Sequence, residues 1–315
     1  MKKEYSLLQE KINGAIYTIF TAFTNDLKID YKSIENYIDF LYSKKAKVFY
    51  VMPYNSRYSQ LREKEIFELN DFCIKKVKSL EGTTIIVSDS IHGPTELKQE
   101  YCIKAKESGV DIFSSICREK YFSNEQILNH YSEMNKCEVP ILVHVVPFLS
   151  GYNAQNMNWP EEIFDELCNL KNIIAVKEDT KDTDFSIALL KKYEPRLRFI
   201  FAGRKKYLLT LINKGLKAYL NGTSIIDPNI DSIFLSLCKT NFLEAQNFVK
   251  EIDDPFWESI VKKYGWHRVN KACLEKIGMM ERVERLPLVS LNDNEYKDVE
   301  IWVEKTLKEL NKWRL

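Results

Sequence analysis

Short runs of apolar residues alternate with amphipathic stretches from about residue 15 to about residue 225 of this chain, which has 315 residues. A short run rich in β-branched residues is typical of a strand with both faces buried, as in a parallel sheet. The stretches between these runs carry apolar residues at the spacing of one helical face. The pattern therefore predicts strands and helices in regular alternation.

The first predicted helix illustrates the signal, because Ile34, Ile38 and Leu41 share one face and Asp30 is placed to cap its start. This first helix covers residues 31–44, and Asn158 and Pro160 open another one. Further helices are predicted over residues 61–79, 94–108, 124–136, 184–192 and 207–214. The predicted strands are residues 15–20, 48–52, 84–87, 112–116, 141–146, 173–176, 198–201 and 218–220.

Eight strands that alternate with helices predict an α/β protein built on a closed (β/α)8 TIM barrel. An open, doubly wound sheet usually has a glycine-rich phosphate turn after its first strand, whereas residues 21–24 read TAFT. The strand pattern stops after Leu220. We expect a barrel over residues 1–228 and a helical C-terminal region, residues 229–315, packed on it. Its predicted helices are residues 229–251, 255–264, 267–278 and 293–312.

Composition and charge exclude some classes of protein function. Hydrophobic residues make up 45% of the chain and charged residues 29%, which is enough apolar material for a full core. The 46 basic and 45 acidic residues leave a net charge of +1, unlike the basic footprint of a nucleic-acid-binding protein. Charged residues interrupt the N-terminal segment, and no apolar stretch is long enough to span a bilayer. We expect neither a signal peptide, nor a nucleic-acid partner, nor a membrane partner.

The cysteines and histidines argue against a metal site and a disulfide framework. Seven cysteines are scattered singly without a CxxC pair, which favours reduced thiols and a cytoplasmic location. The four histidines show neither HxH nor HxxxH spacing. We therefore expect no metal and no cofactor.

Lys177 is the residue whose position in the sequence says most about the chemistry of the protein. It ends an apolar run and is followed by Glu178, Asp179 and Thr180. A lysine at the end of a buried strand must find an anion or lose its proton, because a low dielectric disfavours the charged form. The neutral amine is the nucleophile that Schiff-base chemistry requires. The alternative is a structural lysine that pairs with Glu178 or Asp179 at the sheet edge.

Functional groups of such a barrel gather where its strands end. Side chains alternate along a strand, so Lys177 faces the same way as Ala175, and His144 the same way as Leu142 on the preceding strand. This parity places His144 beside Lys177, where it can shuttle protons. The alternative is a core histidine held by a backbone hydrogen bond. Other side chains at strand ends are Thr21, Tyr54, Asn55, Ser88 to Ser90, Arg204 to Lys206 and Asn221 to Ser224.

Four segments carry a resemblance to a known family. Residues 173–180, IIAVKEDT, resemble the Schiff-base lysine motif of the dihydrodipicolinate synthase/N-acetylneuraminate lyase family, often read G-[IV]-K-x-[ST/A]-[ST]. Residues 139–151 are similar to its fifth strand and the loop that follows, residues 14–21 to its opening strand, and residues 266–278 to its C-terminal helices. The resemblance implies a TIM barrel that forms a homo-oligomer, a dimer or usually a tetramer. It also implies condensation or cleavage of 2-oxo acids through an enamine on Lys177.

Several positions depart from the family pattern. The fifth-strand tyrosine that relays protons aligns with His144. The two hydroxyl residues that bind the pyruvate carboxylate align with Tyr54 and Asn55, so a standard pyruvate pocket is not expected. The family often has an arginine after the fifth strand, and Leu149 stands at that position here. The tyrosine that the family contributes across its dimer interface aligns near Glu119, with Tyr121 close by.

The segments after strands 7 and 8 suggest what the pocket accepts. The neuraminate lyase branch has an acidic pair after strand 7 that binds sugar hydroxyls, whereas Gly203 is followed here by Arg204, Lys205 and Lys206. Cations at the mouth of a barrel favour an anionic group on the substrate. The alternative, particularly for Lys206, is a solvated helix start. Residues 220–224, LNGTS, are closer to the sugar-acid lyases than to the lysine-biosynthesis enzymes.

These observations support two hypotheses. In the first, the chain is a class I aldolase, lyase or dehydratase in which Lys177 forms a Schiff base with a small-molecule 2-oxo acid or sugar acid. His144 then serves as the general acid/base. In the second, the barrel has lost the pyruvate site and acts as a metabolite-binding or regulatory protein. The substrate-binding residues predicted by the first hypothesis are Tyr54, Asn55, Gly203, Arg204, Lys205, Asn221 and Gly222.

Overall fold

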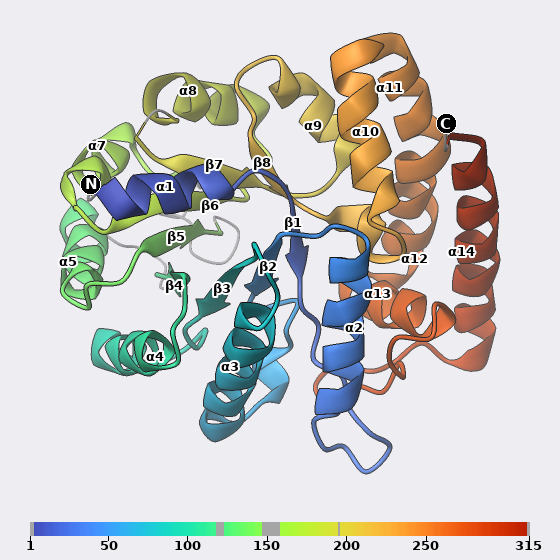
Figure 1. The fold of residues 1–315 in the computed structure, drawn as a ribbon, viewed down its shortest axis with the longest axis horizontal. Helices are drawn as coiled ribbons and strands as arrows, with labels where there is room; N and C mark the ends of the chain where they lie inside the picture. Colours follow the sequence, from blue (N-terminus) through green and yellow to red (C-terminus); the bar gives the residue numbers. More distant parts are fainter. Residues whose placement is uncertain (1–2, 118–122, 147–157, 195, 314–315) are drawn as a thin grey trace.

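The computed structural model describes residues 3–117, 123–146, 158–194 and 196–313, and its centre is a closed barrel of parallel strands (Figure 1). Each strand pairs with the next one in the sequence, and β8 closes onto β1. The predicted (β/α)8 TIM barrel is therefore confirmed. The strands are β1 (Gly14–Thr18), β2 (Val48–Val51), β3 (Thr84–Ser88), β4 (Ile112–Ile116), β5 (Ile141–Val145), β6 (Ile173–Glu178), β7 (Arg198–Phe201) and β8 (Ala218–Leu220).

A helix follows each strand and covers the outside of the barrel. Asp30 caps the first of them, because its Oδ1 accepts a hydrogen bond from the Ser33 amide at 3.0 Å, as predicted. These helices are α2 (Tyr31–Ser43), α3 (Glu63–Lys78), α4 (Thr95–Glu107), α5 (Asn124–Asn135), α7 (Glu161–Asn169), α8 (Thr183–Tyr193), α9 (Lys205–Ile212) and α10 (Asn229–Thr240).

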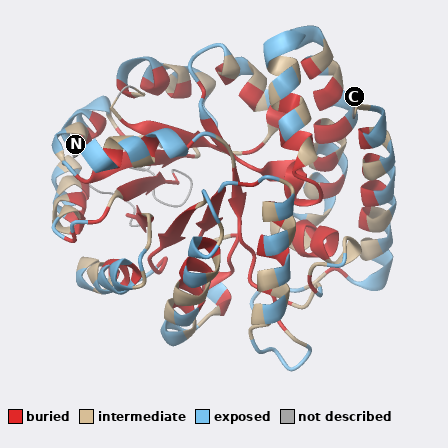
Figure 2. Cartoon of the chain, viewed as in Figure 1, coloured by how far each residue is buried: buried red, intermediate tan, exposed pale blue. Residues whose placement is uncertain are grey.

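The strands are buried on both faces, which explains why their sequences are apolar runs rather than alternating patterns (Figure 2). One apolar cluster fills the inside of the barrel and includes Ile16, Ile86, Leu142 and Ile200. A second, larger cluster lies between the strands and the surrounding helices. The packed interior leaves the carboxyl ends of the strands as the place for a site.

An N-terminal helix, α1 (Lys3–Lys11), was not predicted from the sequence. Its apolar stripe is narrow, since only Tyr5 and Gln9 are buried. Tyr5 packs against the cluster inside the barrel, and Gln9 Nε2 donates to the carbonyl of Ile174 at 2.7 Å and to that of Arg196 at 2.9 Å. α1 thus packs at the amino end of the barrel, opposite the strand ends that hold Lys177.

The C-terminal region is helical, as predicted, but the expected helix over residues 229–251 is interrupted. Asn241 has an extended backbone and caps a new helix by accepting from the Glu244 amide at 3.2 Å. Two π-helical turns follow, a feature often found near functional sites. The elements are α11 (Phe242–Phe248), η3 (Val249–Asp253), η4 (Phe256–Val261), α12 (Lys262–Tyr264), α13 (Trp266–Lys276) and α14 (Asp293–Trp313).

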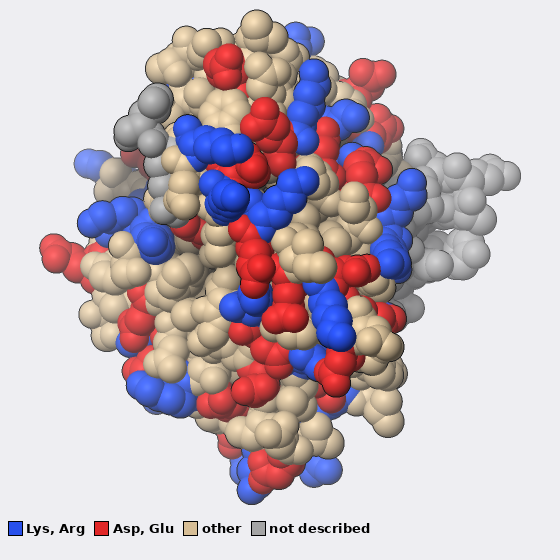
Figure 3. Space-filling view, turned by 90° about the vertical axis from the view of Figure 1, so that its right-hand side faces the viewer, with Lys and Arg blue, Asp and Glu red and all other residues tan. Residues whose placement is uncertain are grey.

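The surface has charges of both signs in close alternation. On the side of the molecule that carries α14, basic and acidic side chains are interspersed (Figure 3). Lys263, for example, pairs with Asp298 at 2.8 Å and Lys276 with Glu304 at 2.6 Å. Within the described ranges, no helix is both long enough and apolar enough to cross a bilayer.

Candidate active site

Lys177 and His144 lie side by side at the carboxyl ends of β6 and β5. The strand register pairs His144 with Lys177 and Leu142 with Ala175, which confirms the shared parity predicted from the sequence. Lys177 and His144 are each only 1% exposed. A buried amine and a buried imidazole are therefore adjacent at the functional end of the barrel.

The two carboxylates after Lys177 have different partners. The Lys177 Nζ lies 3.7 Å from Asp179 Oδ2 and donates to the carbonyl of Glu178 at 3.4 Å. The Glu178 carboxylate instead accepts from Ser186 Oγ on α8 at 2.5 Å and from the Thr180 amide. Burial raises the pKa of Glu178. Asp179 is thus the carboxylate that faces the lysine.

His144 is held as a neutral imidazole. Burial and the positive charge of Lys177 together keep its pKa well below the usual value, so it is uncharged at pH 7. Its Nδ1 has no hydrogen-bond partner among the described residues. The ring of Tyr54 meets the imidazole edge-on, with centroids 6.3 Å apart at 82°. An unpaired nitrogen beside an amine suits a proton carrier better than a core histidine.

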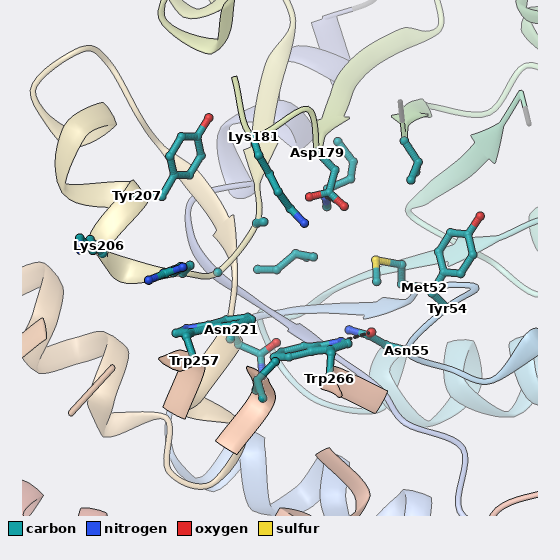
Figure 4. Close-up of a pocket in the computed structure, with 18 of the residues that line it drawn as sticks. Met52, Tyr54, Asn55, Asp179, Lys181, Lys206, Tyr207, Asn221, Trp257 and Trp266 are labelled. Carbon is teal, nitrogen blue, oxygen red and sulfur yellow. Dashed lines mark hydrogen bonds and ion pairs between the residues drawn. The ribbon is translucent and has the colours of Figure 1, made fainter. Parts of the chain in front are cut away.

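A cavity of about 900 Å³ opens over these residues at the carboxyl ends of the strands (Figure 4). Its size is within the usual range for small-molecule sites. Trp257 and Trp266 stack in parallel, 5.0 Å apart at 3°, and form the wall contributed by the C-terminal region. The predicted site residues that line the cavity are Lys177, His144, Tyr54, Asn55, Gly203, Arg204, Asn221 and Gly222.

The side-chain amides of Asn55 and Asn221 line the cavity, and part of their hydrogen-bonding capacity is used by other groups of the protein. Asn55 Nδ2 donates to Thr18 Oγ1 at 3.2 Å, and Asn55 Oδ1 accepts from Trp266 Nε1 at 2.9 Å. Asn221 Oδ1 accepts from the Thr18 hydroxyl at 3.3 Å, whereas its Nδ2 lacks a partner in the part of the chain that the structure describes. Asn55 therefore positions its neighbours, and Asn221 keeps a donor for a ligand.

A family model of the dihydrodipicolinate synthetase family matches residues 11–306. The chain belongs to this family. It is similar to a 4-hydroxy-tetrahydrodipicolinate synthase of Psychrobacter sp., with 21% identity over 305 residues that span 95% of this chain and 97% of the relative. A protein of the same name from Brachyspira hyodysenteriae is 24% identical over 217 residues, which are 68% of this chain and 71% of the relative.

Solved structures of both branches of the family share the fold. N-acetylneuraminate lyase from Mycoplasma synoviae has a TM-score of 0.80 at 22% identity, over 95% of this chain and 99% of that one. Dihydrodipicolinate synthase from Oceanobacillus iheyensis has a TM-score of 0.82 at 15% identity, over 98% and 99%. At such identities the likeness establishes the barrel and its helical extension, not the substrate.

The site of this dihydrodipicolinate synthetase family member differs from the predicted one at Lys205. Its side chain is fully buried, and its Nζ lies 2.9 Å from Asp231 Oδ1 and 3.9 Å from Asp253 Oδ1. The structure thus places Lys205 outside the cavity lining, contrary to the prediction. The next residue, Lys206, is exposed and lines the cavity instead. Adjacent residues of a helix point in different directions, and the sequence alone does not fix which lysine faces the cavity.

Arg204 lines the cavity but is already paired. Its guanidinium binds Glu258 and lies 3.9 Å from Asp254 Oδ1, so part of its charge is compensated. Lys181 and Lys206 add positive charge to the mouth of the cavity. The predicted preference for an anionic ligand group therefore rests more on these two lysines than on Arg204.

Gly203 and Gly222 let two loops approach closely. A Cβ at Gly203 would lie 2.1 Å from the carbonyl oxygen of Leu220, and one at Gly222 would lie 2.3 Å from that of Gly203. Gly222 also has a φ of +57°, a conformation that side-chain-bearing residues rarely adopt. The role of both glycines in the site is therefore to allow the close approach of these two backbone segments.

The strand-2 loop is tied to the C-terminal region by an arginine that sequence reasoning did not single out. Arg57 is 1% exposed, its Nε donates to Glu284 at 2.9 Å, and its guanidinium donates to the His267 carbonyl at 2.7 Å. Burial and the charge of Arg57 lower the pKa of His267 to about 4. This link holds Trp266 and His267 against the loop that carries Asn55.

Other lining residues were also missed as site residues: Asp179, Lys181, Tyr207, Trp257, Trp266 and His267. Helical spacing does not distinguish a tryptophan of the core from one that walls a cavity. Asp179 did carry a signal, because it stands where the family motif has serine, threonine or alanine. Leu149, Glu119 and Tyr121 lie outside the described residues. The part of the chain that the structure describes holds no cluster of three metal-ligating side chains.

Proposed function

We propose that this chain is a lyase of the class I aldolase type, which forms a Schiff base between Lys177 and the carbonyl carbon of a 2-oxo acid or sugar acid. The observation that carries the proposal is the buried Lys177 amine at the base of a cavity, beside His144 in register. A lysine shielded from water can act as a nucleophile once it is deprotonated. The iminium then withdraws electrons from the adjacent carbon, so a bond to that carbon can break or form.

His144 is the proposed proton carrier for the bond-making or bond-breaking step. Its low pKa keeps it neutral, so it can accept a proton from a substrate hydroxyl when a carbon–carbon bond breaks. It occupies the position of the family's proton-relay tyrosine. Its edge-on contact with Tyr54 limits the orientations that the imidazole can take.

The cavity favours a substrate larger than pyruvate. Its volume of about 900 Å³ exceeds what a three-carbon acid fills. Lys181 and Lys206 favour a carboxylate or phosphate on the distal part of the substrate, and Asn221 Nδ2 offers a hydrogen bond. The usual hydroxyl pair for the pyruvate carboxylate is replaced by Tyr54 and Asn55. We therefore propose a longer 2-oxo acid or a sugar acid.

Borohydride trapping tests the proposal. The protein is incubated with pyruvate, longer 2-oxo acids and sugar acids, reduced, digested and mapped by mass spectrometry. We expect an adduct on Lys177 with at least one substrate, no adduct in Lys177→Ala, and an unchanged adduct in Lys214→Ala, whose lysine is exposed outside the cavity lining. If none of the compounds labels Lys177, the proposal fails.

A second candidate is a metabolite-binding or regulatory protein without turnover. It is favoured by Asn55, because hydrogen bonds to Thr18 and Trp266 occupy both ends of its side chain and leave one Nδ2 hydrogen for a substrate carboxylate. In that case a sugar acid should raise the melting temperature of both the native protein and Lys177→Ala, with no adduct after reduction.

A further inference from the structure

Resting on the proposed function, we infer that Asp179 is a further catalytic residue, the general acid–base that exchanges protons with Lys177 while the Schiff base forms. The family's lysine motif has serine, threonine or alanine at this position, so the Asp179 carboxylate departs from the motif. Asp179 follows the last residue of β6 directly and lines the cavity.

The placement of Asp179 gives it access to both the amine and the substrate. Residues two apart on a strand point to the same side, and Asp179 Oδ2 accordingly lies 3.7 Å from Lys177 Nζ. Its side chain is 20% exposed, whereas that of Lys177 is 1% exposed. Figure 4 shows the side chains of Asp179 and Lys181 directed toward the same part of the cavity. A carbonyl oxygen bound above Lys177 is thus within reach of the carboxylate.

Charge balance favours Asp179 over His144 for the first proton transfer. When an ammonium gives its proton to a neutral imidazole, one buried positive charge merely changes place. When it gives the proton to a carboxylate, an ion pair becomes two neutral groups, and burial favours the neutral forms. Asp179 can therefore release the nucleophilic amine without leaving a cation in the site.

Each step of Schiff-base formation balances with Asp179 as the proton carrier. The carboxylate takes a proton from the ammonium, and the free amine attacks the carbonyl carbon as the carbon–oxygen π bond breaks. The carboxyl group protonates the resulting alkoxide and then removes a proton from the new nitrogen–carbon adduct. Finally it donates that proton to the hydroxyl, which leaves as water as the carbon–nitrogen double bond forms. Asp179 begins and ends as a carboxylate.

The charges around Asp179 are mixed. Lys177 from β6 and Lys181 from the following loop are basic, and neutral His144 lines the same cavity from β5. Tyr207 from α9 is also close to Asp179. Burial is the largest cause of the raised pKa of its phenol, and the negative charge of Asp179 adds to it. Glu178 turns away toward α8. Among the described groups that surround it, Lys177 forms an ion pair with Asp179.

The test compares rates of adduct formation in Asp179→Asn, Asp179→Ala and the control Asp184→Asn, an exposed residue at the start of α8. Protein and the best substrate of the trapping panel are mixed and reduced after increasing delays. We expect Asp179→Asn and Asp179→Ala to form the Lys177 adduct about 100-fold more slowly or worse, as general acid–base catalysis implies, but to reach the native extent. Formate should restore the rate of Asp179→Ala and leave Lys177→Ala unlabelled.

The outcomes separate this inference from the proposed function. Native rates in Asp179→Asn would overturn the role of Asp179 while leaving the Schiff base intact. A slow Asp179→Ala that formate does not accelerate would assign Asp179 a positioning role and equally overturn the inference. Absence of any adduct in the native protein would instead remove the proposed function, and this inference with it.

Discussion

Replacing Lys205 by methionine tests whether this residue holds the fold rather than the substrate. Lys205 Nζ is enclosed with Asp231, at 2.9 Å, and Asp253, at 3.9 Å, and all three side chains are at most 3% exposed. Thr223 Oγ1 also donates to Asp253 Oδ1 at 2.5 Å, so that carboxylate stays in place when the lysine is removed. Methionine keeps most of the length of the side chain and removes its charge.

The expected loss of stability follows from the two distances. At an effective dielectric constant of about 20, each contact corresponds to about 4 to 6 kcal/mol of Coulomb attraction, which is an upper bound. Breaking a buried ion pair from one side usually costs about 3–5 kcal/mol, and we expect a loss in that range. Domains are stable by only about 5–15 kcal/mol, so the variant should be near the limit of folding.

Urea unfolding followed by circular dichroism measures this loss, and its pH dependence gives a second check. Burial raises the pKa of Asp253 in the folded protein, and removing Lys205 should raise it further above the unfolded value of about 3.9. The folded variant then binds more protons than the unfolded chain, so its stability falls as the pH rises above about 4. The deficit of Lys205→Met should shrink as the pH is lowered toward 4.

The matched control is Lys206→Met, which changes the neighbouring exposed lysine of the cavity lining. Its stability should stay within about 0.5 kcal/mol of the native protein, as is usual for surface substitutions. If Lys205→Met unfolds at the native urea concentration and binds substrate more weakly, the structural role assigned to Lys205 is refuted.

Three further predictions concern the site. His144→Tyr should keep part of the turnover because the family uses a tyrosine there, whereas His144→Phe should lose about 100-fold or more in kcat; equal kcat in all three forms would dismiss the proton relay. Gly203→Ala should fail to accumulate as folded protein, because the new Cβ would lie 2.1 Å from a backbone oxygen; a native melting temperature would contradict the close approach. Lys206→Glu should raise KM for anionic substrates about tenfold with little change in kcat, and an unchanged KM would remove Lys206 from substrate binding.

The barrel could be predicted from the sequence because its strands are buried on both faces and its helices on one. Both patterns can be read from residues that are close in the sequence. The alternation of side chains along each strand then predicts that His144 lies beside Lys177, as the strand register shows. α1 was missed because a helix that buries little beyond Tyr5 and Gln9 has almost no apolar stripe. The break at Asn241 depends on one capping side chain inside a continuous apolar pattern.

The site was predicted less completely, because its walls come from distant segments. Trp266, which stacks on Trp257, donates a hydrogen bond to Asn55, and no sequence interval encodes that contact. The choice between Lys205 and Lys206 depends on the direction in which α9 begins. Asp179 could have been found from the sequence, as a carboxylate at a position where the resembling motif has a small or hydroxylic residue.

The mass of the borohydride-reduced protein shows whether Lys177 forms a covalent bond with the substrate carbonyl. We expect one added substrate per chain, as the reduced amine, on the peptide that contains Lys177. An unmodified Lys177 in a protein that still turns over a 2-oxo acid or sugar acid would contradict it.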